Sequence, residues 1–470
     1  MKYLSIIFTG IILSLLLISS KPDKKYYSEK YRPQFHFTPE TGRQNAINGL
    51  VFYDGEYHIF YQYLSNNDDL QWGHAISENL VNWKHFPITF NSSDSENCRI
   101  LSGSAVVDEK NILGKQKGND KTFLMFYTGQ NCGLKIAYST NKGTTWENFE
   151  RNPVLPHSDV RHPKVFWHEP TQKWVMILIR EINNDEDTRG ISIYSSSDLL
   201  NWEWKSHISG IEENPDLISL KVTNRPEETK WILFDGDGSY VIGDFDGEVF
   251  SPETDKIYGD NGNNYFAPQT WNNNPAEKGR IIQIALMTGG DFPDMPFSEQ
   301  MTFPTELNIT KLNTGYTLTR LPVKEIALLQ DKHYKWTNRN LIPGIDDNPI
   351  KKIKGDSFRI IAEFDVKTSS NFGFVIRYGK KDLGTEILYN VVRETLSVLG
   401  HTVYIPLVDN KISFEILIDR ASIEVFVNGG QVVFTNNFTP ADKADRYFLD
   451  TNGGELFIKQ MDIYAVKTSW

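Results

Sequence analysis

Short apolar and aromatic runs of strand length, separated by turn residues, fill most of this chain. The stretch LVFYDGEYHIFY (50–61) places Asp54-Gly55, a dipeptide typical of a tight hairpin turn, between two aromatic-rich runs. The stretches 164–179 and 231–247 repeat this scheme. Long patterns with the 3.6-residue period of an amphipathic helix are scarce, so the sequence predicts an all-β protein.

A serine-to-tryptophan phrase recurs in the first half of the chain. It reads SENLVNW (77–83), STNKGTTW (139–146) and SSDLLNW (196–202), and each copy follows a predicted strand. The tryptophans are 63 and 56 residues apart, somewhat more than the roughly 40–50 residues of one propeller blade. Blades with extended loops would account for this spacing. Three unrelated turns are the alternative, but the matching strands before them favour a repeat.

The pattern changes after about residue 309. The following residues read as a connector that is partly helical. From residue 356 the strands are longer and alternate evenly, as in SFRIIAEFDV (357–366), which is typical of a β-sandwich. We therefore expect a propeller at 26–320, a connector at 321–355 and a sandwich at 356–470.

The first twenty residues have the composition of a secretory signal peptide. Lys2 is followed by an apolar run from Leu4 to Ile18 that is too short to span a bilayer well, and then by the small residues Ser19 and Ser20. We expect cleavage of residues 1–20 and a secreted or periplasmic protein. An uncleaved anchor is the alternative.

The only cysteines are Cys98 and Cys132, and each precedes a predicted strand of one expected blade. Export would permit a disulfide between them. Two buried free thiols are the alternative, and the sequence does not decide between the two.

The charge and motif content exclude several classes of partner. A net charge of −11 makes the chain a poor partner for nucleic acid or an anionic membrane. The sequence has no zinc-type Cys/His spacing and no phosphate-binding Gly-rich loop. We expect no cofactor, no metal, no nucleic-acid partner and no membrane partner after signal cleavage.

Several longer phrases carry a resemblance to a known family. They include RPQFHFTPETG (32–42), DGEYHIFYQY (54–63), QWGHAISENLVNWKHFPI (71–88), MPFSEQMTFPTEL (295–307) and DRASIEVFVNGG (419–430). From about Tyr31 to its end, the chain resembles glycoside hydrolase family 32, the invertases, inulinases and levanases. The resemblance implies a five-bladed β-propeller that carries the active site, a C-terminal β-sandwich, a glycosidase fold and a place in β-fructoside and fructan metabolism.

The resemblance also locates three catalytic positions, two of which have changed. The family's nucleophilic Asp lies in a phrase like WMNDPNG, which reads RQNAING here, so that Ala46 stands in its place. The Asp that supports the transition state belongs to an Arg-Asp-Pro phrase and is replaced by His162. The acid/base Glu of a Glu-Cys-Pro-Asp phrase is retained as Glu213, with Glu212 as a register alternative.

These replacements change the chemistry that is available. A methyl group at position 46 cannot form the covalent glycosyl-enzyme of a retaining glycosidase. An inverting route needs a base, for which His162 is the one nearby candidate by residue type. The loss of carboxylates and the arrival of Arg43 predict a neutral or cationic site, which would suit an acidic glycan as well as a fructan. An internal Arg43–Glu213 pair that closes the site is the alternative.

The family's sugar-contacting positions are largely kept. Taken singly, each has an ordinary structural explanation, either core packing or hydrogen bonding to the backbone. Taken as a set on the family framework, they predict a pocket. By the resemblance they are Asn45, Gln62, Trp72, Ser102, Arg161 and either Tyr265 or Phe266, with Arg43 in place of an aromatic residue at the rim.

We therefore expect a secreted family 32-like protein whose ordinary hydrolysis is lost or severely weakened and which acts by binding a glycan, either a fructan or an acidic glycan. One alternative is an active O-glycosyl hydrolase that uses Glu213 and His162. Another is a non-catalytic structural or interaction scaffold. The sequence does not give the linkage of the glycan, the oligomeric state or the role of the sandwich.

Overall fold

The computed structural model describes residues 26–67, 69–91, 98, 100–129, 132–182, 188–273, 279–344, 348–379 and 383–470. The predicted signal peptide at 1–20 lies outside the described residues. In the part of the chain that is described, no helix is long and apolar enough to cross a membrane.

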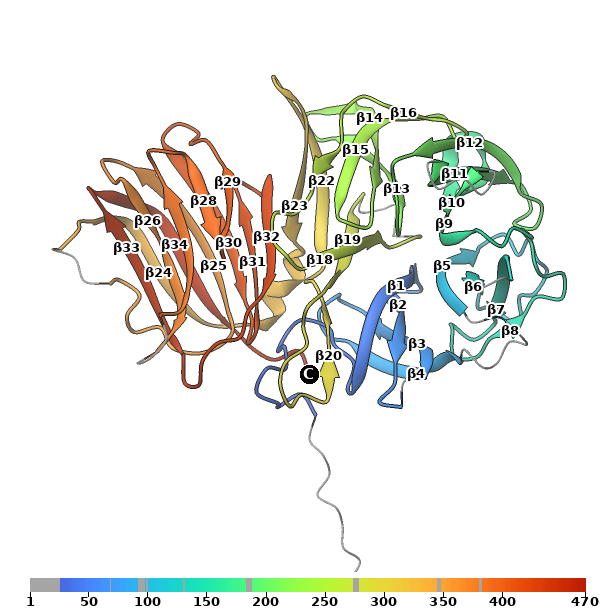
Figure 1. The fold of residues 1–470 in the computed structure, drawn as a ribbon, viewed down its shortest axis with the longest axis horizontal. Coiled ribbons are helices and arrows are strands. Elements are labelled where there is room, and N and C mark those ends of the chain that lie inside the picture. The colour runs from blue at the N-terminus through green and yellow to red at the C-terminus, as the bar shows by residue number, and fades with distance from the viewer. Residues whose placement is uncertain are drawn as a thin grey trace, which may run out of the picture.

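Residues up to 322 form a ring of blades, which confirms the predicted propeller (Figure 1); the strands of the fourth and fifth blades are joined in one ten-stranded sheet through the pairing of β13 with β22. Blades one and two contain β1 (Gly42–Tyr53), β2 (Glu56–Leu64), β3 (Leu70–Ser77), β4 (Lys84–Asn91), β5 (Ile100–Asp108), β6 (Thr122–Gly129), β7 (Leu134–Ser139) and β8 (Glu147–Asn148). Blade three contains β9 (Arg161–His168), β10 (Lys173–Arg180), β11 (Gly190–Ser196) and β12 (Glu203–Ser209), with the 3-10 turn η1 (Glu169–Thr171) after β9. Blade four contains β13 (Asp216–Val222), β14 (Arg225–Phe234), β15 (Ser239–Phe245), β16 (Phe250–Pro252) and β17 (Ile257–Tyr258). Blade five contains β18 (Tyr265–Thr270), β19 (Ile281–Met287), β21 (Gln300–Met301), β22 (Thr305–Leu312) and β23 (Gly315–Pro322), and the short β20 (Phe297–Ser298) pairs in parallel with β1.

The repeated serine-to-tryptophan phrase is the turn between the third and fourth strands of blades one to three. In all three copies the serine hydroxyl accepts a hydrogen bond from the backbone N–H two residues later, at 3.2–3.3 Å. The residue three before each tryptophan has a left-handed backbone in every copy, at Leu80, Gly143 and Leu199. The three phrases are therefore one repeated structural element rather than unrelated turns.

The propeller is closed around its axis by the end of β18 and the residues after it. The Asn272 side chain donates hydrogen bonds to the carbonyl oxygens of Ala105 in blade two (2.8 Å) and Val165 in blade three (2.9 Å). The Asn272 backbone N–H donates to the Leu50 carbonyl of blade one at 3.0 Å. One asparagine of blade five thus contacts three other blades.

Thr270 makes the corresponding contacts with blades three and four. Its N–H and its hydroxyl both donate to the Asp216 carboxylate at 2.7 Å. The Lys164 ammonium donates to the Thr270 carbonyl at 2.8 Å and lies 3.0 Å from the other Asp216 oxygen. Lys164 and Asp216 are both buried, so water cannot solvate their charges. Each charge is stabilised by the other instead.

The C-terminal residues form the predicted β-sandwich, whose two sheets enclose one hydrophobic core. The sheet nearer the propeller contains β24 (Gln330–Leu341), β25 (Phe358–Val366), β30 (Lys411–Ile418), β31 (Ser422–Val427), β32 (Val432–Asn437) and β34 (Leu456–Val466). The outer sheet contains β26 (Asn371–Tyr378), β27 (Thr385–Asn390), β28 (Thr395–Val398), β29 (His401–Tyr404) and β33 (Arg446–Asn452).

One predicted boundary is wrong. The segment 321–355 contains the 3-10 helix η5 (Lys324–Leu329), but it continues into β24, which pairs with β34 as an edge strand of the sandwich. Most β24 side chains face solvent, and only a few, such as Tyr334 and Trp336, pack against the core. An edge strand with so few buried side chains lacks the alternating apolar pattern by which strands are recognised.

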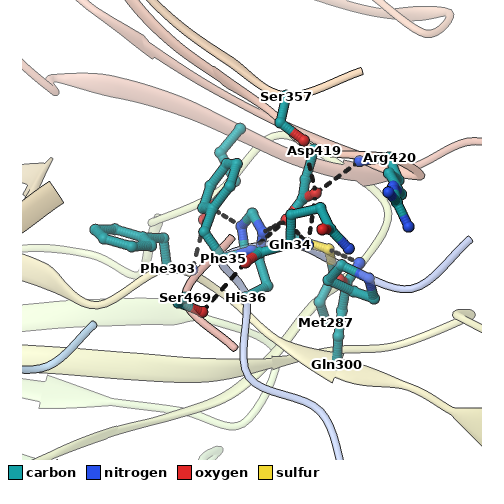
Figure 2. Close-up of polar contacts among 12 residues, drawn as sticks. Gln34, Phe35, His36, Met287, Gln300, Phe303, Ser357, Asp419, Arg420 and Ser469 are labelled. Carbon is teal, nitrogen blue, oxygen red and sulfur yellow. Dashed lines mark hydrogen bonds and ion pairs between the residues drawn. The ribbon is translucent and has the colours of Figure 1, made fainter. Parts of the chain in front are cut away.

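A buried histidine joins the two domains (Figure 2). His36 lies in the segment before β1, the first strand of the propeller. Its two ring nitrogens are each 2.9 Å from a carboxylate of the sandwich, one from Asp419 and the other from Glu424. Burial alone would lower the pKa of His36, but the hydrogen bonds to the two carboxylates outweigh burial and raise this pKa to about 9. Asp419 also accepts hydrogen bonds from the N–H groups of Gln34 and Phe35. At neutral pH an imidazolium therefore links the propeller to the sandwich.

Cys98 and Cys132 form a disulfide with a Cα–Cα distance of 5.6 Å, within the usual range for such bonds. The bridge resolves the alternatives that the sequence left open. It ties the residues before β5 to those before β7, so that it braces blade two at the end where its inner strand begins.

We expect Asn272→Leu to destabilise the propeller by about 2–4 kcal/mol, because two buried carbonyl groups lose their donors. Urea unfolding followed by tryptophan fluorescence measures this change. Asn308→Leu, at an exposed position of β22, is the matched control. Equal unfolding midpoints for the two variants would contradict the role assigned to Asn272.

Candidate functional site

Most of the residues selected from the sequence lie where the five inner strands begin; Gln62 and Trp72 lie in β2 and β3 instead. Successive inner strands pack side by side around the axis: a Cβ added to Gly49 of β1 would lie 2.8 Å from the Ala105 Cβ of β5, and Val51 bridges Asn272 in parallel. Their first residues therefore gather at one end of the axis (Figure 1). Ala46 belongs to the start of β1, Ser102 to β5, Arg161 and His162 to β9, Glu213 to the turn before β13, and Tyr265 and Phe266 to β18.

Ala46 lies in an irregularity of β1. Gln44 pairs with Tyr63 of β2, but the next paired residue is Ile47, opposite Tyr61, so Asn45 and Ala46 fall outside the regular ladder. Asn45 is exposed and Ala46 half-buried, whereas Gln44 and Ile47 are buried. Such a bulge re-aims side chains away from the sheet. The bulge therefore turns Asn45 and Ala46 out of the regular strand, at the end of the axis where the other candidates lie. At position 46 the side chain offered there is only a methyl group.

Ser102 and His162 connect blades two and three. The His162 N–H donates to the Ser102 hydroxyl oxygen at 2.9 Å, and that hydroxyl is 2.7 Å from the hydroxyl of Thr128. Ser102 is thus used to hold the left-handed backbone of His162, whose φ is 50°. Burial, and secondly the charge of Arg161, lower the pKa of His162 to about 4, although the Asn214 side chain opposes this shift. The imidazole is therefore neutral near pH 7.

The backbone of the turn that carries Glu213 is held by Asp235, a residue that was not predicted from the sequence. The Asp235 carboxylate accepts hydrogen bonds from the N–H groups of Glu212 and Glu213 at 3.2 Å and is paired with Lys256 at 2.8 Å. Glu212 is exposed and Glu213 is half-buried. Among the described residues no side chain pairs with the Glu213 carboxylate. Asp235 carries no signal in the sequence, because its role depends on the strand β14 lying beside this turn.

The two arginines lie beside carboxylates, which counts against the cationic form of the site expected from the sequence. Arg43 lies 3.3 Å from Glu299, not against Glu213, and Arg161 lies 3.0 Å from Glu181. Glu181 follows β10, whose Ile179 is the cross-strand neighbour of Arg161. These acids were not found from the sequence because strand pairing, rather than sequence distance, brings them to the arginines.

The aromatic candidates divide between the site and the core. The Tyr265 hydroxyl donates to Gln283 at 2.8 Å, and the Arg320 guanidinium lies 4.0 Å over its ring, so Tyr265 is held within blade five, in a hollow that Gly430 and Gln431 of the sandwich also line. Trp72 is only 1% exposed and packs in the core of blades one and two. Neither offers a wall to a sugar. Phe266 is half-buried and remains the aromatic candidate.

The remaining positions bind neighbouring backbone. The Gln62 amide donates to the Leu101 carbonyl at 3.1 Å and so joins blades one and two. The N–H of Ala267 donates to the Gly236 carbonyl at 2.7 Å, which places the start of β18 beside the turn of Glu213. His162, Asn214 and Ala267 all have left-handed φ values of 40–50°. Strained backbone of this kind is usual at binding and catalytic sites.

We expect the His162 imidazole to titrate with a midpoint of about 4. Because this value is below the ordinary 6.5, the folded protein resists protonation and loses stability at this group as the pH falls from about 6.5 towards 4. Ring C–H signals in NMR spectra, assigned by their absence in His162→Gln, would report the midpoint. A midpoint near 6.5 would show that the ring is solvated.

Comparisons with known proteins agree with this architecture. The model of the glycosyl hydrolases family 32 N-terminal domain matches residues 36–322, and that of the family 32 C-terminal domain matches residues 325–465. The levanase of Bacillus subtilis (strain 168) is 33% identical over 516 aligned residues, which cover 99% of this chain and 74% of the levanase. An extracellular exo-inulinase of Aspergillus awamori is 26% identical and covers 94% of this chain and 96% of its own.

Solved structures show the same fold. The exo-inulinase from Aspergillus awamori superposes with a TM-score of 0.84 at 24% identity, over 94% of this chain and 100% of the inulinase. A fructofuranosidase from Schwanniomyces occidentalis, complexed with fructosylnystose, gives a TM-score of 0.80 at 23% identity over 94% and 98% of the two chains. Both domain models of the family match, and the levanase aligns with 99% of this chain. This chain therefore belongs to glycoside hydrolase family 32, among relatives that act in fructan metabolism.

Proposed function

We propose that this protein is exported and binds fructan without hydrolysing it at a useful rate. The observation that carries this proposal is Ala46: the irregularity of β1 presents a methyl group at the position from which a nucleophilic carboxylate would act. Position 46 therefore supplies no carboxyl group to act together with Glu213, the retained acid/base position.

Retaining glycosidases use two carboxyl groups roughly 5–5.5 Å apart, one that attacks the anomeric carbon and one that donates a proton. The other acids near this site are engaged elsewhere. Glu299 is paired with Arg43, Glu181 with Arg161, and Asp235 with Lys256. None of these carboxylates lies on the bulge that presents Ala46.

A rearranged hydrolase that uses His162 as a base is disfavoured by the surroundings of the ring. A general base must accept a proton during the reaction. At His162 this would create an imidazolium in a largely buried place beside Arg161 and Arg189, the same factors that lower its pKa.

The surrounding frame supports continued binding of sugar. Asn45 is exposed on the bulge, Phe266 is half-buried at the start of β18, and Glu213 is free to accept hydrogen bonds from hydroxyl groups. The backbone is left-handed at His162 and Ala267, a conformation that clusters at binding and active sites. Family relatives have been solved with fructosylnystose and with 1-kestose. Because both arginines are paired, a neutral fructan suits the site better than an acidic glycan.

Export is supported by three separate features. The N-terminal residues have the pattern of a signal peptide. Cys98 and Cys132 form a disulfide, a bond that persists in oxidising compartments. The Aspergillus awamori relative is described as extracellular.

We expect the purified mature protein to release little or no fructose from sucrose, inulin or levan while it still binds fructo-oligosaccharides. Losing a nucleophile that acts together with an acid costs several orders of magnitude in rate. Fructose release measured by chromatography, beside calorimetric titration with nystose, tests both parts. Turnover of roughly 1–1000 per second would sink the first part, and the absence of any heat of binding would sink the second.

Restoring both acids should recover activity weakly at best. Ala46→Asp with His162→Asp supplies the two missing carboxylates, but Arg43 remains paired with Glu299 at the start of β1, and Ile47 has replaced the motif's proline. The same double variant carrying Glu213→Gln is the matched control and should have no activity. Full family-like turnover of the double variant would show that the rest of the site had not drifted.

A further inference from the structure

The outer sheet of the sandwich carries a groove on the face that points away from the sandwich core. The sheet is ordered β29-β28-β27-β26-β33, and alternate side chains of each strand are buried between the two sheets. The other sheet is the one that packs against the propeller, through Leu417, Phe426 and Val433. The groove encloses about 250 Å³ over β26 and its neighbours β27 and β33.

A glycine forms the floor of this groove. Gly373 of β26 pairs with Leu388 of β27 on one side and with Asp450 of β33 on the other. A Cβ at this position would lie 2.1 Å from the Ile387 carbonyl oxygen, so no other residue fits the backbone here. The missing side chain leaves a depression in the middle of an otherwise covered sheet face.

The groove has one apolar side and one polar side. Val375, paired with Phe448, lies on the apolar side. On the polar side Asn371 pairs with Asn452, whose side-chain amide donates to the side-chain oxygen Oδ1 of Asn371 at 3.2 Å. The carboxylate of Asp450 has no partner among the described side chains, although the residue is partly buried.

These groups match a neutral polyhydroxyl ligand. Asparagine amides both donate and accept hydrogen bonds, and a carboxylate accepts them from hydroxyl groups. The apolar side offers contact area for the C–H face of a sugar ring. Among the described residues that line the groove none is lysine or arginine, while Asp450 and Glu386 are acidic. An anionic ligand is therefore disfavoured.

The polar character continues across the sheet beyond the groove. The outward positions of β28 and β29 carry the hydroxyl groups of Thr395, Ser397, Thr402 and Tyr404, in register with the residues of the groove. Neighbouring strands are about 4.8 Å apart. A chain that crosses the strands therefore meets a group able to bind a hydroxyl on each of them.

We propose that this groove is a second glycan-binding site, separate from the propeller, which holds a neutral oligosaccharide chain across β33, β26 and β27. The polyhydroxyl chemistry of the ligand follows from the groove alone. The choice of fructan as that ligand rests on the proposed function. A protein with both sites would hold one polysaccharide at two points, which raises its apparent affinity without new contacts at either site.

The test isolates the groove by blocking the propeller site with Ala46→Trp. Native gels that contain levan, inulin or dextran measure the retardation of this variant. Adding Asn371→Ala with Asp450→Ala should weaken its binding to levan or inulin at least tenfold. Adding Asn308→Ala with Asp255→Ala, an asparagine and an aspartate exposed on the propeller, should leave binding unchanged. Circular dichroism spectra would verify that all the variants are folded.

Three results would overturn the second site. The first is no retardation of Ala46→Trp by any of the three glycans. The second is equal retardation with and without the groove substitutions. The third is a dimer seen by analytical ultracentrifugation that the groove substitutions abolish, which would assign the groove to a second copy of the chain. The proposed function is judged by a different comparison, wild type against Ala46→Trp, so either site can fail without the other.

Discussion

The propeller depends on the contacts that Thr270 and Asn272 make around its axis. Through their side chains and backbone, these two residues of blade five reach all four other blades. Apolar clusters also lie between neighbouring blades, each shared by two of them, and the polar contacts of Thr270 and Asn272 fix the blades nearer the axis. Because the candidate site is built from the starts of five different strands, its geometry is set by how these strands are held around the axis.

The sandwich is fixed to this ring by charge as well as by apolar contact. His36 lies between Asp419 and Glu424 with no exposed surface, and the residues beside it pack against the inner sheet of the sandwich through Phe35 and Phe426. A buried imidazolium is stable only while both carboxylates remain in place. This arrangement ties the two domains into one unit and leaves the outer sheet of the sandwich as the face turned to solvent.

The candidate site is defined by its backbone as well as by its side chains. The strand β1 is irregular at Asn45 and Ala46, left-handed residues lie at the starts of β9 and β18, and the Asp235 carboxylate accepts a hydrogen bond from the Glu213 N–H. By the resemblance to the family's motifs, Ala46 and His162 stand at the centre in place of acids. The removal of those two negative charges is not balanced by free positive ones, since Arg43 and Arg161 each have their own carboxylate. The result is a site of low net charge, which suits a neutral sugar.

The sequence by itself determined the features that depend on local pattern. It predicted the strand period, the repeated blade turn and the order of the two domains. It also predicted the turn at Asp54-Gly55, where both residues have left-handed φ values. Family phrases located Ala46, His162 and Glu213, because these positions are defined by their immediate neighbours in the chain.

Only the tertiary structure decided which distant residues meet. Strands from different parts of the chain must come together before these contacts exist. They decide the carboxylate partners of Arg43 and Arg161, the pairing of Cys98 with Cys132 and the place of β24 in the sandwich. They also decide that Tyr265, unlike Phe266, is held by Gln283. A local sequence pattern specifies a strand and the face it buries, but not the neighbour against which that face is laid. That choice is made by packing and register across the whole fold.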